Sequence, residues 1–112
     1  MRDLAVLDRW DTWGEIHAQP AIWSAWGNAF DPVPLRDWIA DQQVDEIWFC
    51  GAGTSAFIGD IIVSGLEGQA GPRLRSVPTT DLVSRPQAFL RGKRPLVVNF
   101  GRSGNSAESI GT

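Results

Sequence analysis

Two glycine-and-hydroxyl stretches contain the residues of this chain that are best suited to chemistry. Residues 51–56 read Gly-Ala-Gly-Thr-Ser-Ala, and residues 101–106 read Gly-Arg-Ser-Gly-Asn-Ser. Glycines let the backbone turn sharply and approach a ligand, while hydroxyls and exposed backbone N–H groups bind a compact anion such as a terminal phosphate. We therefore predict a phosphate-binding site. Its candidate residues are Gly53, Thr54, Ser55, Arg102, Ser103, Asn105 and Ser106.

Each stretch lies between an apolar run and a helical pattern. Residues 47–50 lead into the first stretch, and residues 95–100 lead into the second. The start of a helix carries free N–H groups and a partial positive charge, which favour an anion. An alternative stays open, in which both turns are only tight connections whose hydroxyls cap the helices. Asn105 and Glu108 have the spacing of a capping box, and Arg102 either adds charge to the site or points to solvent.

The elements around these turns alternate between helix and strand. Strands are expected to end at Cys50 and to span 73–77 and 95–100, with one helix from about 54 that ends near 65–68 and another from 107 onward. This alternation predicts an α/β fold with a partial doubly wound parallel sheet, three strands in the order 2-1-3 and flanking helices. Strands one and three then lie side by side, and the two turns meet at one crevice. We divide the chain into a helical segment, 1–43, and a domain over 44–112.

The segment before the sheet is rich in tryptophan. Residues 1–31 are typical of helix with breaks, with a second helix that could begin at Pro20, and a short helix is expected over 34–43 after Asp31 or the prolines. Four of the six tryptophans lie in residues 1–31, at spacings that place them on helical faces. They form either a layer packed on the domain or a partner surface. His17, the one histidine, is interpreted as a surface or packing residue.

Several single residues support expectations about the core. Cys50 is expected to be buried packing. The apolar strand over 95–100 is expected to be buried on both faces. Residues 91–94 read as a solvent-exposed basic turn. Asp81 either caps a short helix that Pro86 interrupts or lines a ligand cleft.

Composition and rival motifs exclude other classes of function. The net charge of −3 gives no basic field for nucleic acid or an anionic membrane, and no apolar run approaches the length of a membrane span. One cysteine and one histidine cannot build a metal site, and the start of the chain does not read as a signal peptide, so a cytoplasmic location is expected. Residues 51–56 match a dinucleotide-binding fingerprint, but the second strand lacks the acidic residue that this fingerprint needs. Asn105 breaks the nucleophile-elbow pattern, and no catalytic residue is assigned.

Three blocks of the chain together resemble the sugar isomerase (SIS) domain. They are residues 51–60, 78–84 and 100–106. More closely, they are similar to the AgaS group of galactosamine-6-phosphate deaminase/isomerases, also called tagatose-6-phosphate ketose/aldose isomerases, and residues 15–23 are similar to that group's N-terminal stretch. The resemblance implies a sugar-phosphate substrate, no cofactor and a homo-oligomeric full-length enzyme. Family phosphate contacts fall on Thr54, Ser55, Ser103 and Ser106, with Arg102 and Asn105 at loop positions that have family counterparts.

The chain departs from this family in one residue type and in length. Many SIS domains have serine at the position of Gly101. Similar proteins carry two such domains, and their acid/base groups come from later segments. We therefore expect the N-terminal part of an AgaS-like enzyme, which binds a phosphosugar but is not catalytic alone. The alternatives are a regulatory module that senses a sugar phosphate and a truncated reading frame that aggregates through its exposed third strand.

Overall fold

The computed structural model describes residues 6–7, 9–66 and 68–112. The chain divides into two units, Met1–Asp37 and Trp38–Thr112, and each is described by itself. In the first unit, α1 (Asp11–Ala29) is one helix that continues through Pro20. The expected second helix beginning at Pro20 is therefore wrong. Proline lacks an N–H and costs helix stability, but the helix-forming residues on both sides of Pro20 continue the helix past it.

Aromatic side chains along α1 pair with neighbours four residues away. The Trp26 and Phe30 rings stack with their centroids 4.7 Å apart. His17 packs against the Trp13 ring and its Nδ1 lies 2.9 Å from the Trp13 carbonyl oxygen, which confirms a packing role. A partner surface on α1 stays a prediction.

The short helix α2 (Val33–Asp41) lies across the boundary of the two units. The Val33 N–H donates to Asp31 Oδ1 at 3.0 Å, so the predicted start signal at Asp31 is confirmed. The predicted division between residues 43 and 44 stays a prediction.

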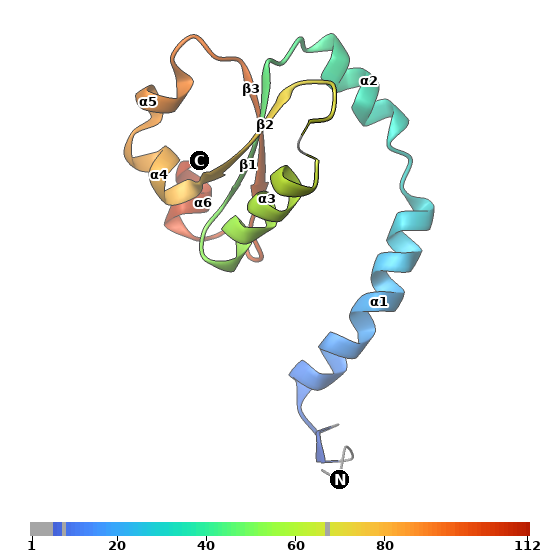
Figure 1. The fold of residues 1–112 in the computed structure, drawn as a ribbon. Coiled ribbons are helices and arrows are strands. Elements are labelled where there is room, and N and C mark those ends of the chain that lie inside the picture. Colours follow the sequence, from blue (N-terminus) through green and yellow to red (C-terminus); the bar gives the residue numbers. More distant parts are fainter. Residues whose placement is uncertain (1–5, 8, 67) are drawn as a thin grey trace. The chain divides into compact units, whose positions relative to one another are not determined.

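The second unit is built on three parallel strands in the order β2-β1-β3, as predicted (Figure 1). These strands are β1 (Glu46–Gly51), β2 (Arg73–Pro78) and β3 (Pro95–Phe100). Gly51, the last residue of β1, is the register partner of Pro78 on one side and of Phe100 on the other. The carboxyl ends of all three strands therefore lie at the same end of the sheet.

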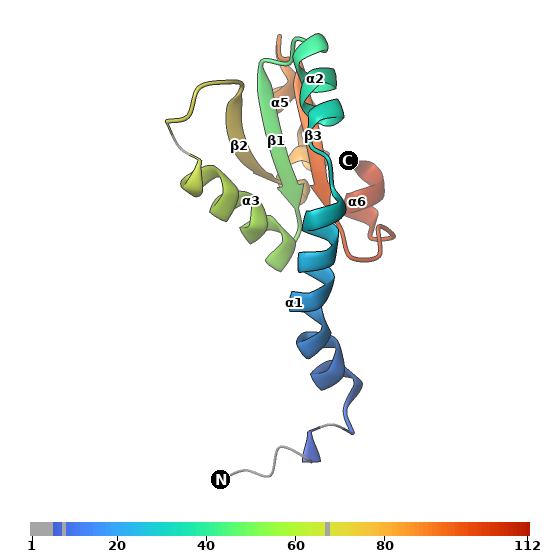
Figure 2. The same cartoon turned by 90° about the vertical axis from the view of Figure 1, so that its right-hand side faces the viewer.

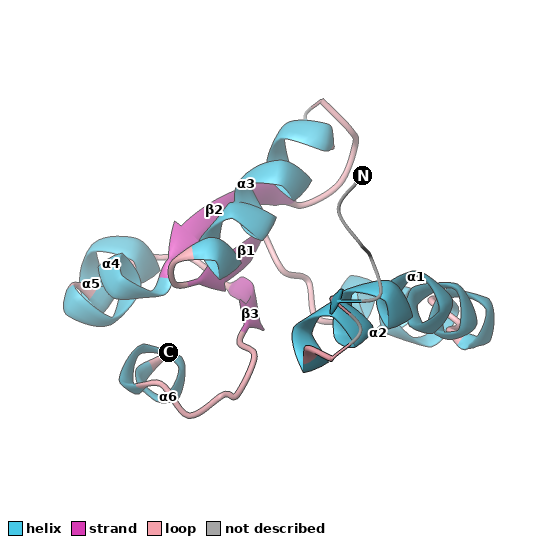
Figure 3. Cartoon of the chain, turned by 90° about the horizontal axis from the view of Figure 1, so that it is seen from below, coloured by secondary structure: helices cyan, strands magenta, loops and turns pink. Residues whose placement is uncertain are grey.

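Helices cover the two faces of this sheet unequally. Helix α3 (Thr54–Gly65) packs on one face, where a Cβ added to Gly59 would stand 3.0 Å from the Phe49 carbonyl oxygen. The other face carries three short helices, and Figure 3 shows them across the sheet from α3. They are α4 (Thr79–Ser84), α5 (Pro86–Leu90) and α6 (Ala107–Gly111). Pro86 separates α4 from α5, as expected from its position in the sequence.

The buried core lies on the face that carries the short helices. It consists of Trp48, Cys50, Val77 and Leu82, with Phe89 packed against it. Burial raises the pKa of the Cys50 thiol, and the expected packing role of this cysteine is confirmed. The expectation that 95–100 is buried on both faces is wrong. Within the described chain β3 pairs with β1 alone, and Val97 is 39% exposed, because an edge strand lacks the second neighbour that would cover it.

A buried carboxylate ties the opposite end of the sheet together. Glu46 is 2% exposed and accepts a hydrogen bond from the Trp48 indole N–H at 2.6 Å. Arg75 and Lys93 lie 3.3 and 3.1 Å from its oxygens. Burial raises the pKa of Glu46, but these three partners outweigh it and lower the pKa to about 2. Residues 91–94 are exposed, as expected, and Lys93 in addition forms an ion pair with Glu46.

Candidate functional site

The first predicted turn, between β1 and α3, is held by close backbone packing. A Cβ at Gly51 would stand 2.6 Å from the backbone carbonyl of Ser55, so only glycine fits without a shift. Gly53 has a φ of 58°, a conformation that side chains rarely adopt. The Ser55 N–H donates to the Ala52 carbonyl at 3.2 Å, which completes the turn. The two glycines thus have the backbone role that the sequence predicts.

The hydroxyls of this first turn have no structural partner among the described residues. Helix α3 begins at Thr54 after Gly53, and no side chain caps it. Thr54 is exposed and Ser55 is half-buried. No described residue accepts from the Thr54 N–H, which is one of the groups that a helix start leaves unpaired. This turn therefore presents two hydroxyls and a backbone donor that are available to an anion.

The second predicted turn, between β3 and α6, uses its hydroxyls internally. Ser103 Oγ accepts from the Asn105 N–H at 3.3 Å. Ser106 Oγ accepts from the Ser109 N–H at 3.2 Å and lies 2.9 Å from Ser109 Oγ. Ser106 is therefore the N-cap of α6, and the expected capping box of Asn105 with Glu108 is wrong, because the helix begins one residue later. The alternative in which a hydroxyl caps a helix is confirmed for Ser106.

The sheet brings the two turns to neighbouring strand ends. Gly51 and Phe100 are register partners, and adjacent strands lie roughly 5 Å apart. Figure 2 shows both connections leaving the same end of the sheet, with α3 and α6 on opposite sides of it. Such a divergence is the topological switch point at which open α/β sheets bind ligands. All seven predicted site residues lie in or next to these two connections, and Arg102 is exposed.

A third polar connection, between β2 and α4, shares this edge. Pro78 is the N-cap of α4, and Asp81 lies in its first turn without capping it, so the expected cap at Asp81 is wrong. The Asp81 side chain is exposed. Two residues before it, the Thr79 hydroxyl is buried and finds no hydrogen-bond partner in the described structure. The alternative in which Asp81 lines a ligand cleft stays open.

The chain is similar in sequence to proteins named AgaS from several bacteria. No family model matches the chain. D-galactosamine-6-phosphate deaminase AgaS of Escherichia coli is 41% identical over 113 aligned positions, which cover 88% of this chain and 28% of that protein. The protein of the same name from Shewanella sp. (strain ANA-3) is 37% identical and covers 86% of this chain and 27% of its own length.

Solved structures agree with the sequence relatives. The tagatose-6-phosphate ketose/aldose isomerase of Escherichia coli superimposes with a TM-score of 0.70 at 39% identity, over 89% of this chain and 29% of that one. The chain is homologous to the AgaS group of SIS-fold proteins. A Clostridium novyi NT protein provisionally assigned the same isomerase name has a TM-score of 0.79 at 30% identity, over 88% of this chain and 27% of that one. The predicted AgaS resemblance and α/β fold are confirmed, and the chain spans less than a third of these relatives' lengths.

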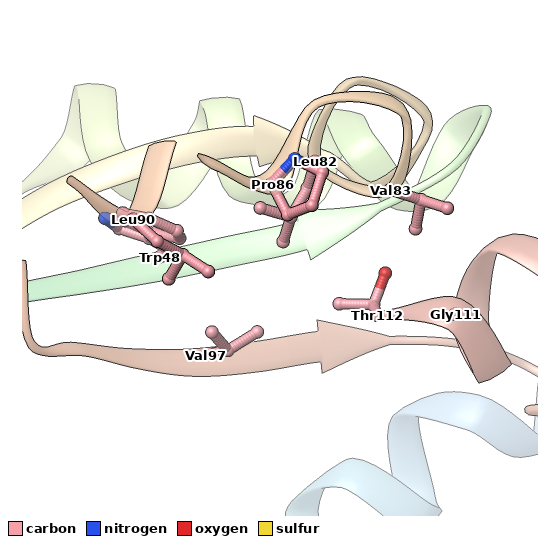
Figure 4. Close-up of a pocket in the computed structure, with 8 residues that line it drawn as sticks. All are labelled: Trp48, Leu82, Val83, Pro86, Leu90, Val97, Gly111 and Thr112. Atoms are coloured by element: carbon pink, nitrogen blue, oxygen red, sulfur yellow. The ribbon is translucent and has the colours of Figure 1, made fainter. Parts of the chain in front are cut away.

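An apolar hollow in the second unit is a separate feature from the predicted site. A cavity of about 150 Å³ lies between β3 and the short helices, where Trp48, Leu82 and Val97 face one another (Figure 4). None of the seven predicted residues lines it. Its walls are mostly hydrocarbon, which suits neither a phosphate nor sugar hydroxyls.

In the described ranges, no three histidine, cysteine, aspartate or glutamate side chains gather as a metal site. Over those same ranges, none of the helices is long and apolar enough to span a membrane.

Proposed function

We propose that this chain binds the phosphate group of a hexose 6-phosphate between its β1–α3 and β3–α6 connections. The observation that carries the proposal is that two hydroxyl-rich connections leave adjacent strand ends at one switch point. The names of the relatives, which refer to galactosamine 6-phosphate and tagatose 6-phosphate, supply the substrate class. Arrival of a doubly charged phosphate would recruit donors from both sides of the crevice.

The residues have different roles in this proposal. Thr54 and Ser55 donate through their unbonded hydroxyls, and the backbone around Gly53 turns toward the anion. Ser103 donates its free O–H to the phosphate while it still accepts from the Asn105 N–H, and Ser106 exchanges its bond to Ser109 Oγ for one to the phosphate. Asn105 adds its side-chain amide, and Arg102 adds a positive charge from an exposed loop.

Catalysis is assigned in this proposal to the longer relatives. Aldose–ketose isomerisation needs a positioned acid and base at neighbouring carbons. His17, the one histidine, donates or accepts within α1 and belongs to the first unit. The proposal therefore describes a binding chain that is silent alone, with a cytoplasmic location and homo-oligomeric assembly for the full-length form.

Calorimetric titration of the intact chain tests this function. Galactosamine 6-phosphate is expected to bind, whereas galactosamine is not, because the phosphate provides the attraction. Ser55→Ala and Ser103→Ala should each weaken binding by roughly 1.5–3 kcal/mol, the scale for hydrogen bonds to charged groups. Ser64→Ala, at an exposed position near the far end of α3, is the matched control and should leave affinity unchanged. Equal affinity for the two sugars would refute the proposal.

A further inference from the structure

Helix α1 is continuous although its own sequence opposes a helix. Pro20 lies inside it, together with Gly14 and Gly27. A proline in a helix interior costs about 3 kcal/mol relative to alanine, and each glycine costs about 1 kcal/mol. A helix of this composition is stable in water only where another surface packs on it. The first unit provides no such surface among its described residues, because α1 contains no buried residue.

The exposed apolar side chains of α1 gather on one face. At about 100° per residue they fall within an arc of roughly 120°. We call this face the aromatic stripe, and it consists of Ile16, Ile22, Trp23, Trp26 and Phe30. Trp23 and Trp26 are 67% and 65% exposed, and the Trp26 ring stacks on that of Phe30. A contiguous exposed apolar stripe of this kind is typical of an interface.

The charges along α1 restrict what can cover the aromatic stripe. Residues 16–30 contain no aspartate, glutamate, lysine or arginine, and the acids of α1, Asp11 and Glu15, precede the stripe. A charged partner surface would be desolvated here without gaining an ion pair, so the covering surface must itself be apolar. A second copy of this chain brings such a face with the same length and composition. The pairing of two identical faces is the arrangement of a two-fold dimer.

The area of the aromatic stripe agrees with a small dimer interface. Large side chains bury about 150–250 Å² each, so at the observed exposures the stripe offers on the order of 600 Å² per copy. Mutual cover would bury roughly 1,000–1,200 Å² over both copies, which is the low end of specific interfaces. Tryptophan is also one of the side chains that most often carry the binding energy of an interface.

We infer that the aromatic stripe is a self-association surface, on which α1 of one copy packs against α1 of a second copy. The offsetting of the proline and glycine costs in α1 by this packing explains how the helix continues through Pro20. The inference is independent of the proposed phosphate binding, whose residues all belong to the second unit.

Sedimentation velocity of the 112-residue chain tests the inference between about 1 and 100 μM, the range in which an interface of this size dissociates. The unaltered chain should pass from monomer to dimer as its concentration rises. Trp26→Glu should raise the dissociation constant at least about 30-fold, because it places a negative charge in the apolar interface. Trp26→Leu keeps the stripe apolar and favours a helix, so it should dimerise more strongly than Trp26→Glu.

The matched control is Asn28→Glu, which adds the same charge to the same end of α1 but on the side opposite the stripe. This variant should dimerise like the unaltered chain. A chain that stays monomeric over the whole concentration range overturns the inference. Dimerisation that Trp26→Glu leaves unchanged also overturns it and assigns association to another surface, such as the edge of β3. Equal weakening by Trp26→Glu and Asn28→Glu overturns it as well, because the position of the charge relative to the stripe would then not matter.

Discussion

The two phosphate-turn candidates have similar sequences but opposite internal bonding. In the β1–α3 turn, backbone packing at Gly51 holds the chain, and the hydroxyls of Thr54 and Ser55 are left without partners in the described structure. In the β3–α6 turn, hydroxyls hold the chain, because Ser103 and Ser106 bind the backbone of their own loop. The first turn thus offers its donors directly. In the second turn Ser103 keeps its O–H free, but Ser106 must give up its bond to Ser109 Oγ before it can donate to a ligand.

This difference indicates that hydroxyl residues at a turn do not by themselves define a binding site. A hydroxyl that already donates its proton, as Ser106 does to Ser109 Oγ, gains less from a ligand, because one bond is exchanged for another. Close glycine packing removes that demand, since the turn is then shaped without side chains. The first turn should therefore provide more of the binding free energy per hydroxyl. The following predictions test whether the two turns differ in this way.

The largest expected effect is on the stability of the fold, and it comes from Glu46 at the end of the sheet opposite the two turns. It tests whether side-chain bonding that holds the fold together is confined to the β3–α6 turn. The pKa of Glu46 is lowered to about 2 from 4.5, so its ion pairs stabilise the fold fully above pH 4.5. This contribution is lost as the pH falls from 4.5 toward 2, and it amounts to roughly 3 kcal/mol. Urea denaturation at pH 7 and pH 3 should show about 2 kcal/mol of this loss, because pH 3 lies between the two pKa values, and Glu46→Gln should largely remove the pH dependence. Parallel pH profiles for the two proteins would contradict the assignment.

The second effect compares the glycines that begin the two turns. Gly51→Ala should lower the free energy of unfolding by roughly 2–3 kcal/mol, because its Cβ would overlap the Ser55 backbone. Gly101→Ala should change it by less than about 0.5 kcal/mol, because its nearest neighbour, Ser109 Oγ, would lie 3.4 Å away in ordinary contact. Chemical denaturation measures both. Equal losses would show that the two turns are packed alike.

The smallest effect separates capping from binding. Ser106→Ala should destabilise the fold by about 1 kcal/mol, because it removes the N-cap of α6. Thr54→Ala should leave stability nearly unchanged, since Thr54 caps nothing, yet it should weaken phosphosugar binding more than Ser106→Ala does. Melting curves and titrations of the same two variants give both numbers. A stability loss confined to Thr54→Ala would reverse the comparison.

Much of the frame of the sheet is predictable from local pattern. Strand 95–100 has the predicted bounds, and the helix from Thr54 ends at Gly65, within the predicted range of 65–68, since apolar runs and glycine turns delimit both elements. The order 2-1-3 also follows from the alternation of elements. The errors concern boundaries and partners. Asn105 and Ser106 are both good caps, and only the position of the α6 start decides between them.

The Glu46 cluster shows what local pattern could not provide. Glu46 and Trp48 have the strand spacing that places them on one face, which is a weak signal in retrospect. Lys93 follows them by more than forty positions, and it read as part of an exposed turn. Pairing across long separations depends on the register of strands. For that reason, the burial of Glu46 could not be inferred from its neighbours in sequence.

For this chain, residue types alone are enough to locate three strands and two glycine turns, because those features depend on interactions within about ten residues. The family resemblance is also readable from the sequence, because short blocks of residues carry it. The folded sheet alone settles which hydroxyls are occupied and which acid is buried. Hydrogen bonds and burial are properties of neighbours in space. Ser55 and Ser106 therefore look equivalent along the chain and become different only once β1 and β3 pair and their helices diverge.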